Sequence, residues 1–296
     1  MIGAVLILLA GAAALKGSTK GPPSSNRQQA HTSPSPGPAA TPAAPASPSV
    51  APAGGGTTFV IVMENRSFDE ALRSPYIGSL AQSYAVATNY HSISTPSLPN
   101  YLAMTSGSTF GIADDSYRVL PGGGLGTQLT AADVSWRVYA EGFTGDCVGS
   151  RYPYAVKHNP FAFYGGACPS NVVAFSQLQP DLAGSTPRLA WIIPNLCNDG
   201  HDCTSATADR WLSEVVPSIL ASSAWRNSGA LFLTWDEAES PSSNRVPLIV
   251  VAPTLIHSTS TAQYDHYSLL ATIEDRLGVP RLGNAASANP ITDLFR

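Results

Sequence analysis

The chain has 296 residues, of which 44% are hydrophobic and only 12% are charged, and its formal net charge is −4. This length allows one large domain or two small ones, with enough apolar residues for a buried core. Lys and Arg are scattered without a basic run, so the composition does not indicate an obligate nucleic-acid partner. Because charged residues are at about half their usual share, the places where acidic residues gather carry information.

The chain starts with an apolar segment, residues 1–15, which reads MIGAVLILLAGAAAL. It is shorter than the roughly 20 residues that a membrane-spanning helix needs, and it ends in small residues, as signal peptides do. No Lys or Arg precedes it, so an uncleaved anchor and a buried helix remain alternatives. We expect a secreted or extracellular protein with no stable membrane span in its mature form, and we leave open an association with the cell wall or membrane.

A segment rich in Pro, Ala, Ser, Thr and Gly follows at residues 16–56 and shows no apolar periodicity. Such a segment cannot bury enough surface to offset the entropy lost on ordering it, so we expect a disordered, semi-extended linker. The composition changes abruptly at Thr57. We therefore expect residues 57–296 to form a single folded domain.

The four cysteines, Cys147, Cys168, Cys197 and Cys203, agree with export, because an even number in an exported protein usually indicates disulfides. Proximity in the sequence favours pairing the first two and the last two, but all three pairings remain open. A structural zinc site is the alternative. No C-x-x-C spacing supports it.

Apolar runs alternate with helical patterns along the rest of the chain. Continuous β-branched and apolar runs, typical of strands buried on both faces, occur at Thr57–Met63, Trp136–Ala140, Leu189–Ile193, Ala230–Thr234 and Val246–Ala252. Apolar residues three and four apart predict helices at Leu98–Thr105, Ala206–Ala221 and His266–Leu277. This alternation predicts an α/β fold with a parallel sheet.

Polar clusters follow three of the predicted strands directly. They are Glu64-Asn65, Asp236-Glu237 and the segment Asn195–Asp202, which reads NLCNDGHD. In open α/β sheets ligands bind beyond the carboxyl ends of the strands, and carboxylate and amide oxygens suit a divalent cation. Ordinary strand-end turns are the alternative, and for either pair alone they explain the residues better. The coincidence of all three clusters favours a metal site.

Ser97 lies at the start of a predicted helix in the segment TPSLPNYLAMTSG. The first turn of a helix presents unpaired N–H groups and the positive end of the dipole, which stabilise an anion. The alternative is that Ser97 only caps the helix. Among the histidines, His201 lies within the acidic segment, His158 within KHNPF, and His266 at the start of the last helix.

Six motifs now occur in order: MENRSFD, TPSLPNYLAMTSG, KHNPF, PNLCNDGHD, TWDE and DHYSLLATIEDRLGVPRLG. Together they resemble the phosphoesterase family of bacterial acid phosphatases and phospholipases C, within the alkaline phosphatase superfamily. The segment around Ser97 is also similar to the nucleophile region of nucleotide pyrophosphatase/phosphodiesterases. The resemblance spans nearly all of residues 57–296. It implies an alkaline-phosphatase-like α/β domain, with a mostly parallel sheet sandwiched between helices.

The resemblance also implies a role for each matching residue. Ser97 would be the nucleophile and form a phosphoryl-enzyme intermediate, and Asn100 would hold a phosphate oxygen. His201, His266 and His158 would contact the phosphate or protonate the leaving group. One divalent metal ion (Zn, Mn, Mg or Ca) would be bound by Glu64, Asn65, Asp236, Glu237 and Asp202, although Asp202 could instead orient a histidine.

The implied activity is hydrolysis of a small phosphorylated substrate outside the cell, as in acid phosphatases, with no protein partner. A phosphodiesterase or phospholipase C acting on lipid head groups or nucleotides is the second reading. The third is a non-catalytic, wall-associated binding protein. Two features depart from the family pattern. Asp236-Glu237 stands where the acid phosphatases usually have two aspartates, and the chain lacks the extra C-terminal domains of the family's phospholipases C.

Overall fold

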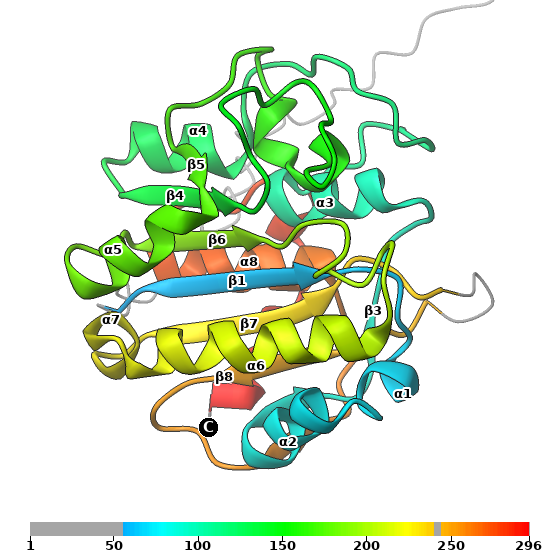
Figure 1. Cartoon of the computed structure of the whole chain (residues 1–296), viewed down its shortest axis with the longest axis vertical. Coiled ribbons are helices and arrows are strands. Elements are labelled where there is room, and N and C mark those ends of the chain that lie inside the picture. Colours follow the sequence, from blue (N-terminus) through cyan, green and yellow to red (C-terminus); the bar gives the residue numbers. More distant parts are fainter. Residues whose placement is uncertain (1–55, 240–243, 296) are drawn as a thin grey trace, which may run out of the picture. The chain divides into compact units, whose positions relative to one another are not determined.

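The computed structural model describes residues 56–239 and 244–295, which form an α/β domain with a central sheet between two layers of helices (Figure 1). The predicted segment 1–15 and all but the last residue of the predicted linker 16–56 lie outside the described residues. The predicted fold class, a mostly parallel sheet covered by helices, is confirmed.

The central sheet contains eight strands within the described part of the chain. Only β8 runs antiparallel to its neighbours. In spatial order the strands are β5 (Val172–Ala174), β4 (Trp136–Ala140), β6 (Leu189–Ile193), β1 (Thr58–Met63), β7 (Ala230–Trp235), β8 (Leu248–Val251), β2 (Ala85–Ala87) and β9 (Ser258–Ser260). A separate two-stranded sheet joins β3 (Tyr90–His91) and β10 (Tyr264–Asp265).

Strand β1 lies at the centre of the sheet, and all six of its residues are buried. Its Val60 pairs with Trp191 of β6 on one side and with Phe232 of β7 on the other. A strand covered on both faces requires apolar side chains pointing both ways, which explains the continuous run TFVIVM. Because β1 runs parallel to both β6 and β7, the carboxyl ends of the three strands lie side by side.

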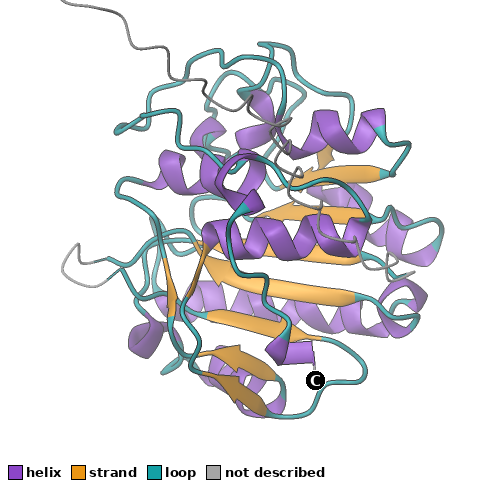
Figure 2. Ribbon diagram, turned by 180° about the vertical axis from the view of Figure 1, so that it is seen from behind, coloured by secondary structure: helices purple, strands orange, loops and turns teal. Residues whose placement is uncertain are grey.

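Helices cover both faces of the sheet, as the two opposite views show (Figures 1 and 2). Helix α6 (Ser205–Ala221) packs with α2 (Pro75–Ser83) and α5 (Leu178–Ala183) on one face. On the other face, α3 (Ser97–Ser106) packs against α4 (Gly124–Ala131) and α8 (His266–Leu277). The short helices α1 (Phe68–Ala71) and α7 (Ser223–Arg226) complete the described set of α-helices.

Helix α8 begins and ends at residues suited to those positions. The Asp265 carboxylate accepts the Ser268 N–H at 3.0 Å, and Gly278 ends the helix in the left-handed region at φ 75°. Pro280 follows two residues later. The predicted bounds of α8 are confirmed, and those of α3 and α6 differ by one residue at most at each end.

Two disulfides form, Cys147–Cys168 and Cys197–Cys203, which is the pairing that sequence proximity favoured. The second closes a seven-residue ring that contains Asp199, His201 and Asp202. No helix within residues 56–239 or 244–295 is both long enough and apolar enough to cross a bilayer.

Glu274 on α8 is fully buried, which is unusual for a carboxylate. Its Oε1 accepts the Leu282 N–H at 2.9 Å, and its Oε2 has no hydrogen-bond partner. Burial raises the pKa of Glu274 from 4.5 to about 8. The folded state therefore retains a proton that the unfolded chain releases.

Between pH 4.5 and 8 the native state binds more protons at Glu274 than the unfolded state does, so stability should fall as pH rises. We expect this group to cost about 2–4 kcal/mol by pH 8, and Glu274→Gln should remove that dependence. The measurement is the free energy of unfolding in urea from pH 5 to 9 for both proteins. The control is the same substitution at Glu214, which is exposed on α6. Parallel pH profiles for wild type and Glu274→Gln would contradict the assignment.

Candidate active site

Most of the predicted site residues gather where three central strands end and one helix begins. Glu64 and Asn65 follow β1, and Asp236 and Glu237 follow β7. Helix α3 begins at Ser97 beside them. Strand β6 is the neighbour of β1 on its other side, and the ring closed by Cys197–Cys203 follows it. This ring carries Asp199, His201 and Asp202.

Ser97 is the first residue of α3, and its side chain does not cap the helix. Its hydroxyl instead donates to Glu64 Oε2 at 3.1 Å and lies 3.4 Å from Glu237 Oε1. Ser97 is 1% exposed. The reading of Ser97 as an N-cap is therefore wrong, because its hydroxyl is committed to two carboxylates from separate strands.

Glu64 is the most heavily contacted carboxylate of the site. Tyr101, one turn into α3, donates its hydroxyl to Glu64 Oε1 at 2.7 Å. The Asn65 side-chain amide donates to Glu64 Oε2 at 3.3 Å. Asn65 itself adopts φ 55°, a left-handed conformation that asparagine tolerates better than most residues. In this conformation its backbone N–H reaches Asp236 Oδ1 at 3.2 Å and ties the two strand ends together.

The carboxyl groups of the site are buried close together, so their negative charges repel one another. Burial raises the pKa of Glu64 well above its usual value, and the negative charges of Asp236 and Asp199 raise it further. Burial likewise raises the pKa of Asp236 to about 8 and that of Asp199 to about 7. Burial also raises the pKa of Glu237. Such a cluster has a strong affinity for positive charge.

Two oxygens of this cluster, Asp236 Oδ2 and Glu237 Oε2, are buried without a hydrogen-bond partner. An unpaired buried oxygen costs free energy unless a donor or a cation satisfies it. Together with Glu64 and the Asn65 amide, they form the oxygen-rich ligand set that hard or borderline divalent cations take. The residues present therefore fit one divalent ion at Ser97.

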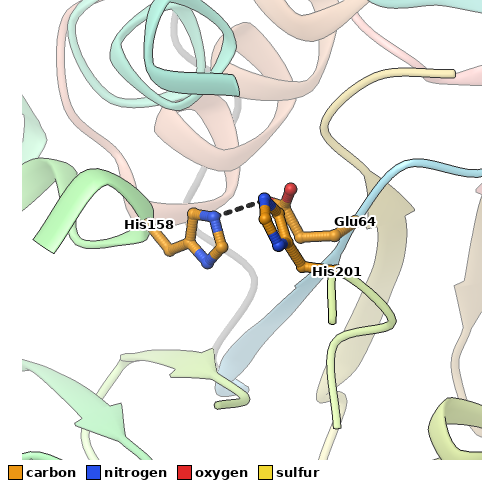
Figure 3. A group of neighbouring side chains, drawn as sticks. All are labelled: Glu64, His158 and His201. Carbon is orange, nitrogen blue, oxygen red and sulfur yellow. Dashed lines mark ion pairs between the residues drawn. The ribbon is translucent and has the colours of Figure 1, made fainter. Parts of the chain in front are cut away.

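His158 and His201 lie beside Glu64, and one ligand atom from each of the three falls within 4.8 Å of the others (Figure 3). His158 Nε2 is 3.1 Å from Glu64 Oε1, and its Nδ1 is 3.1 Å from Asp199 Oδ2. Burial lowers the pKa of His158 well below its usual value, so the ring is neutral and has a single N–H for two carboxylates. The three side chains form a second candidate group of metal ligands that shares Glu64.

His158 also stacks on the ring of Tyr101, with centroids 5.3 Å apart, and is 1% exposed. The sequence predicted that His158 contacts the phosphate or protonates the leaving group. The structure encloses the ring between Glu64, Asp199 and Tyr101, and its Nε2 is buried without a hydrogen-bond partner among the described residues.

His201 Nδ1 lies 2.6 Å from Asp202 Oδ1, and its Nε2 lies 3.1 Å from Lys157 Nζ. Because a carboxylate only accepts, the Nδ1–H donates to Asp202, and Nε2 accepts from the ammonium. Asp202 was predicted as a metal ligand, with orientation of a histidine as the alternative. The structure brings its carboxylate to His201, where its side chain is 39% exposed, which fits the alternative of orienting a histidine.

His266 lies behind the site rather than in it. Its Nε2 donates to the backbone oxygen of Asp236 at 2.6 Å, and its Nδ1 accepts from the Tyr90 hydroxyl at 2.7 Å. Burial lowers the pKa of His266 to about 4. Both ring nitrogens therefore have partners within the protein, Nε2 on the turn that carries Asp236 and Nδ1 on Tyr90 of β3, and the predicted contact with the phosphate or leaving group stays a prediction.

Asn100 was predicted to hold a phosphate oxygen, and the structure gives its amide other partners. Its Oδ1 accepts the N–H groups of Ile93 and Ser94, and its Nδ2 donates to the carbonyls of Ser94 and Pro96. Both amide hydrogens are therefore used within the segment before Ser97. Asn100 fixes that segment and so helps to fix the position of Ser97.

Four residues of the site were not assigned from the sequence: Tyr101, Asp115, Lys157 and Asp199. Three of them stand inside the motifs that the sequence analysis quoted, so those motifs were the available signal. Asp115 lies in the irregular segment after α3, where the sequence offers no pattern. It accepts the Leu98 N–H with Oδ1 at 3.0 Å and binds Lys157 Nζ with Oδ2 at 2.9 Å.

The sequence model of the Phosphoesterase family matches residues 71–280. The chain belongs to this family. A phosphatidylinositol-3-phosphatase of Mycobacterium tuberculosis is 33% identical over 244 residues, which cover 80% of this chain and 81% of that protein. A probable acid phosphatase of Kluyveromyces lactis is 30% identical over 76% of this chain, and the match spans 59% of that longer protein. Phosphoesterase membership and these relatives identify the chain as a hydrolase of phosphoric esters.

Solved structures agree on the fold. A protein of the alkaline phosphatase superfamily from Vibrio parahaemolyticus superimposes with a TM-score of 0.55 at 11% identity, covering 79% of this chain and 70% of that one. At this identity the likeness concerns the fold alone. It confirms the alkaline-phosphatase-like architecture expected for this phosphoesterase.

Glu64→Gln should lower divalent-metal affinity, because it removes a charge shared by both candidate ligand groups while keeping the shape of the side chain. The loss should be at least about 10-fold, the smaller end of what outer-sphere substitutions alone cost. Metal content after dialysis against Zn, Mn, Mg or Ca, measured by mass spectrometry, checks this. Asp202→Asn is the matched control and should retain its metal. Equal metal content in wild type and Glu64→Gln would remove Glu64 from the ligand set.

Proposed function

We propose that this phosphoesterase is an exported, metal-dependent phosphomonoesterase that acts through a phosphoserine at Ser97. The observation that carries the proposal is the hydroxyl of Ser97, buried and held by Glu64 and Glu237 from two separate strands. A serine that only stabilised its helix would direct its oxygen to the backbone N–H groups of the first turn.

In the proposed reaction the Ser97 oxygen attacks phosphorus in line with the leaving alcohol. A new bond from oxygen to phosphorus forms, the ester bond to the alcohol breaks, and the hydroxyl proton passes to the carboxylates that already accept it. Glu64 and Glu237 are placed to take that proton, because both carboxylates lie within hydrogen-bond distance of the hydroxyl. A divalent ion bound by Glu64, Asn65, Asp236 and Glu237 would lower the pKa of the hydroxyl and neutralise charge on the phosphoryl oxygens.

His201 is the proposed source of the proton for the leaving alkoxide. Asp202 accepts the Nδ1–H and fixes the ring orientation, while Nε2 accepts from Lys157 in the free enzyme. To act as the acid, His201 must therefore take up a second proton on Nε2, which requires Lys157 to turn away from that nitrogen. His266 does not suit that role, because both of its ring nitrogens are bonded, to Tyr90 and to the Asp236 carbonyl. His158 does not suit it either, because its ring lies between Glu64 and Asp199. Water then attacks the phosphoserine, inorganic phosphate leaves, and the serine hydroxyl is restored.

Monoesters are favoured over diesters by the surroundings of the site. A diesterase needs room and apolar contacts for a second ester group, and the candidate aromatic residues lie between Tyr152 and Tyr164. Tyr154, Phe161, Phe163 and Tyr164 are all packed into the core, and Tyr152 alone is exposed, at 68%. Both relatives, a phosphatidylinositol-3-phosphatase and a probable acid phosphatase, are also named as phosphatases.

Export is supported by the two disulfides, which form and persist in oxidising compartments. The apolar segment 1–15 and the linker 16–56 agree with this, as read from the sequence. A binding protein without catalysis is disfavoured, because Ser97 and the carboxylates around it are all present and in contact.

Ser97→Ala should lower turnover at least about 1,000-fold, because no other hydroxyl replaces the attacking group. Rapid quenching of the wild type with radiolabelled phosphomonoester should trap label on the tryptic peptide that contains Ser97. The variant should trap none and should keep its fold and metal content. Ser79→Ala, an exposed serine on α2, is the control for the substitution itself. Near-normal turnover by Ser97→Ala would rule out the phosphoserine.

Chelation should abolish turnover, and re-addition of one of Zn, Mn, Mg or Ca should restore it. The assay uses p-nitrophenyl phosphate, bis-p-nitrophenyl phosphate and a short-chain phosphatidylinositol 3-phosphate, from pH 5 to 9. We expect the monoesters to be hydrolysed faster than the diester. Full activity after exhaustive chelation would contradict metal dependence, and faster hydrolysis of the diester would reverse the substrate assignment.

A further inference from the structure

Lys157 and Asp115 form the outer part of the site, and the proposed mechanism gives neither of them a task. The inner residues Ser97 and Glu64 are 1% and 0% exposed. By contrast, the side chains of Lys157 and Asp115 are 18% and 31% exposed. A substrate that reaches the nucleophile therefore arrives from the side of Lys157 and Asp115.

The Asp115 carboxylate occupies two donors next to the nucleophile. Its Oδ1 accepts the N–H of Leu98, the residue that directly follows Ser97, and its Oδ2 accepts from Lys157 Nζ. A backbone N–H in the first turn of a helix and an ammonium are the donors that bind anionic oxygens best. Asp115 thus holds a carboxylate where the phosphate of a substrate would find the same two donors.

Lys157 is oriented toward this position by partners on both sides. One N–H of its ammonium contacts Asp115, and His201 Nε2 lies 3.1 Å away. Burial alone would lower the pKa of Lys157, but the charges of Glu64, Asp115 and Asp236 raise it, so it remains a cation. Arg66, by comparison, directs its guanidinium to Glu70, Ser205 and the Asn65 carbonyl.

We propose that Lys157 binds the substrate phosphate and selects the dianion of a monoester over a diester, and that Asp115 stands in for that phosphate in the free enzyme. The proposal rests on the proposed function and adds the residue that distinguishes a doubly charged phosphate from a singly charged one. A monoester presents three terminal oxygens with two charges, whereas a diester presents two with one. The extra oxygen needs an extra cationic donor, and displacement of Asp115 makes Lys157 available for it.

The alternative is that Asp115 and Lys157 form an ion pair that only stabilises the loop after α3. The two interpretations predict different effects of the Asp115 substitution on phosphate affinity. If the pair is structural, removing either partner has the same effect. If Asp115 competes with phosphate for Lys157, removing Lys157 weakens phosphate binding and removing the charge of Asp115 strengthens it.

The experiment measures kcat and KM on p-nitrophenyl phosphate and bis-p-nitrophenyl phosphate, and the inhibition constant of inorganic phosphate, with the metal-loaded chain. Lys157→Met should lower kcat/KM for the monoester about 10- to 100-fold, the worth of one hydrogen bond to a charged group, and change the diester at most about 3-fold. Lys157→Arg should keep most of the monoester preference. Asp115→Asn should lower both the KM for the monoester and the inhibition constant of phosphate several-fold.

Asp114 and Arg118 supply matched controls. They pair with each other on the same loop, and their side chains are 53% and 38% exposed. Asp114→Asn and Arg118→Gln repeat the charge changes without touching Leu98 or Ser97, and should shift neither substrate more than about 2-fold, as expected for a surface pair. Thermal unfolding verifies each fold, and Lys157→Gln replaces Lys157→Met if the latter fails to fold.

Equal losses on both substrates in Lys157→Met, or weaker phosphate binding in Asp115→Asn, would overturn the proposal and leave a structural ion pair. Failure of the proposed function is recognised separately, because then the wild type itself turns over neither substrate with any metal. In that case calorimetry with inorganic phosphate alone still decides the role of Lys157, since the wild type should bind phosphate and Lys157→Met should bind it at least about 10-fold more weakly.

Discussion

The whole site is organised around the cost of burying several carboxylates together. Glu64, Asp199, Asp236 and Glu237 are each at most 6% exposed, and Lys157 is the cation that acts on them from nearby. Because these carboxylates repel one another, they stay close together only on elements that cannot move apart. Strands from the middle of a sheet meet that requirement, because each is fixed by neighbours on both sides and by helices above and below.

The neutral histidines and the amides keep this arrangement in place. His266 and Asn100 touch only groups that present the reacting residues, and His158 lies between two carboxylates. Burial keeps His158 and His266 uncharged at physiological pH, so they can hold their partners without adding charge. The side chains of Lys157, Asp115 and His201, by contrast, are partly exposed. The site therefore has a buried inner cluster, which includes Ser97, and a partly exposed outer set of charged and imidazole groups.

Much of the fold could be predicted because β1, β6 and β7 read as continuous apolar runs, and a strand buried on both faces has no other pattern. The acidic residues at their ends followed from the same reasoning. Short elements such as β5 and α4 carry no periodicity long enough to detect. The sequence also could not separate the histidines. His201, His158 and His266 look alike in motifs, and only depth and the partner of each nitrogen distinguish a candidate acid from a scaffold. Asp115 shows the same limit, since its role depends on a loop that brings it back to Leu98.

The small disulfide ring at the end of β6 makes the structure of the site depend on the redox conditions under which the chain folds. Cys197 and Cys203 enclose Asp199, His201 and Asp202, so one covalent link holds a buried acid and the candidate proton donor in register with Glu64. In a reducing compartment that link is absent, and the same residues are held only by hydrogen bonds within a short, polar turn. Oxidative folding thus becomes part of assembling the catalyst. For the exported enzyme proposed above, copies that are still in a reducing cytoplasm would lack this link, and Asp199 and His201 would be less firmly placed there.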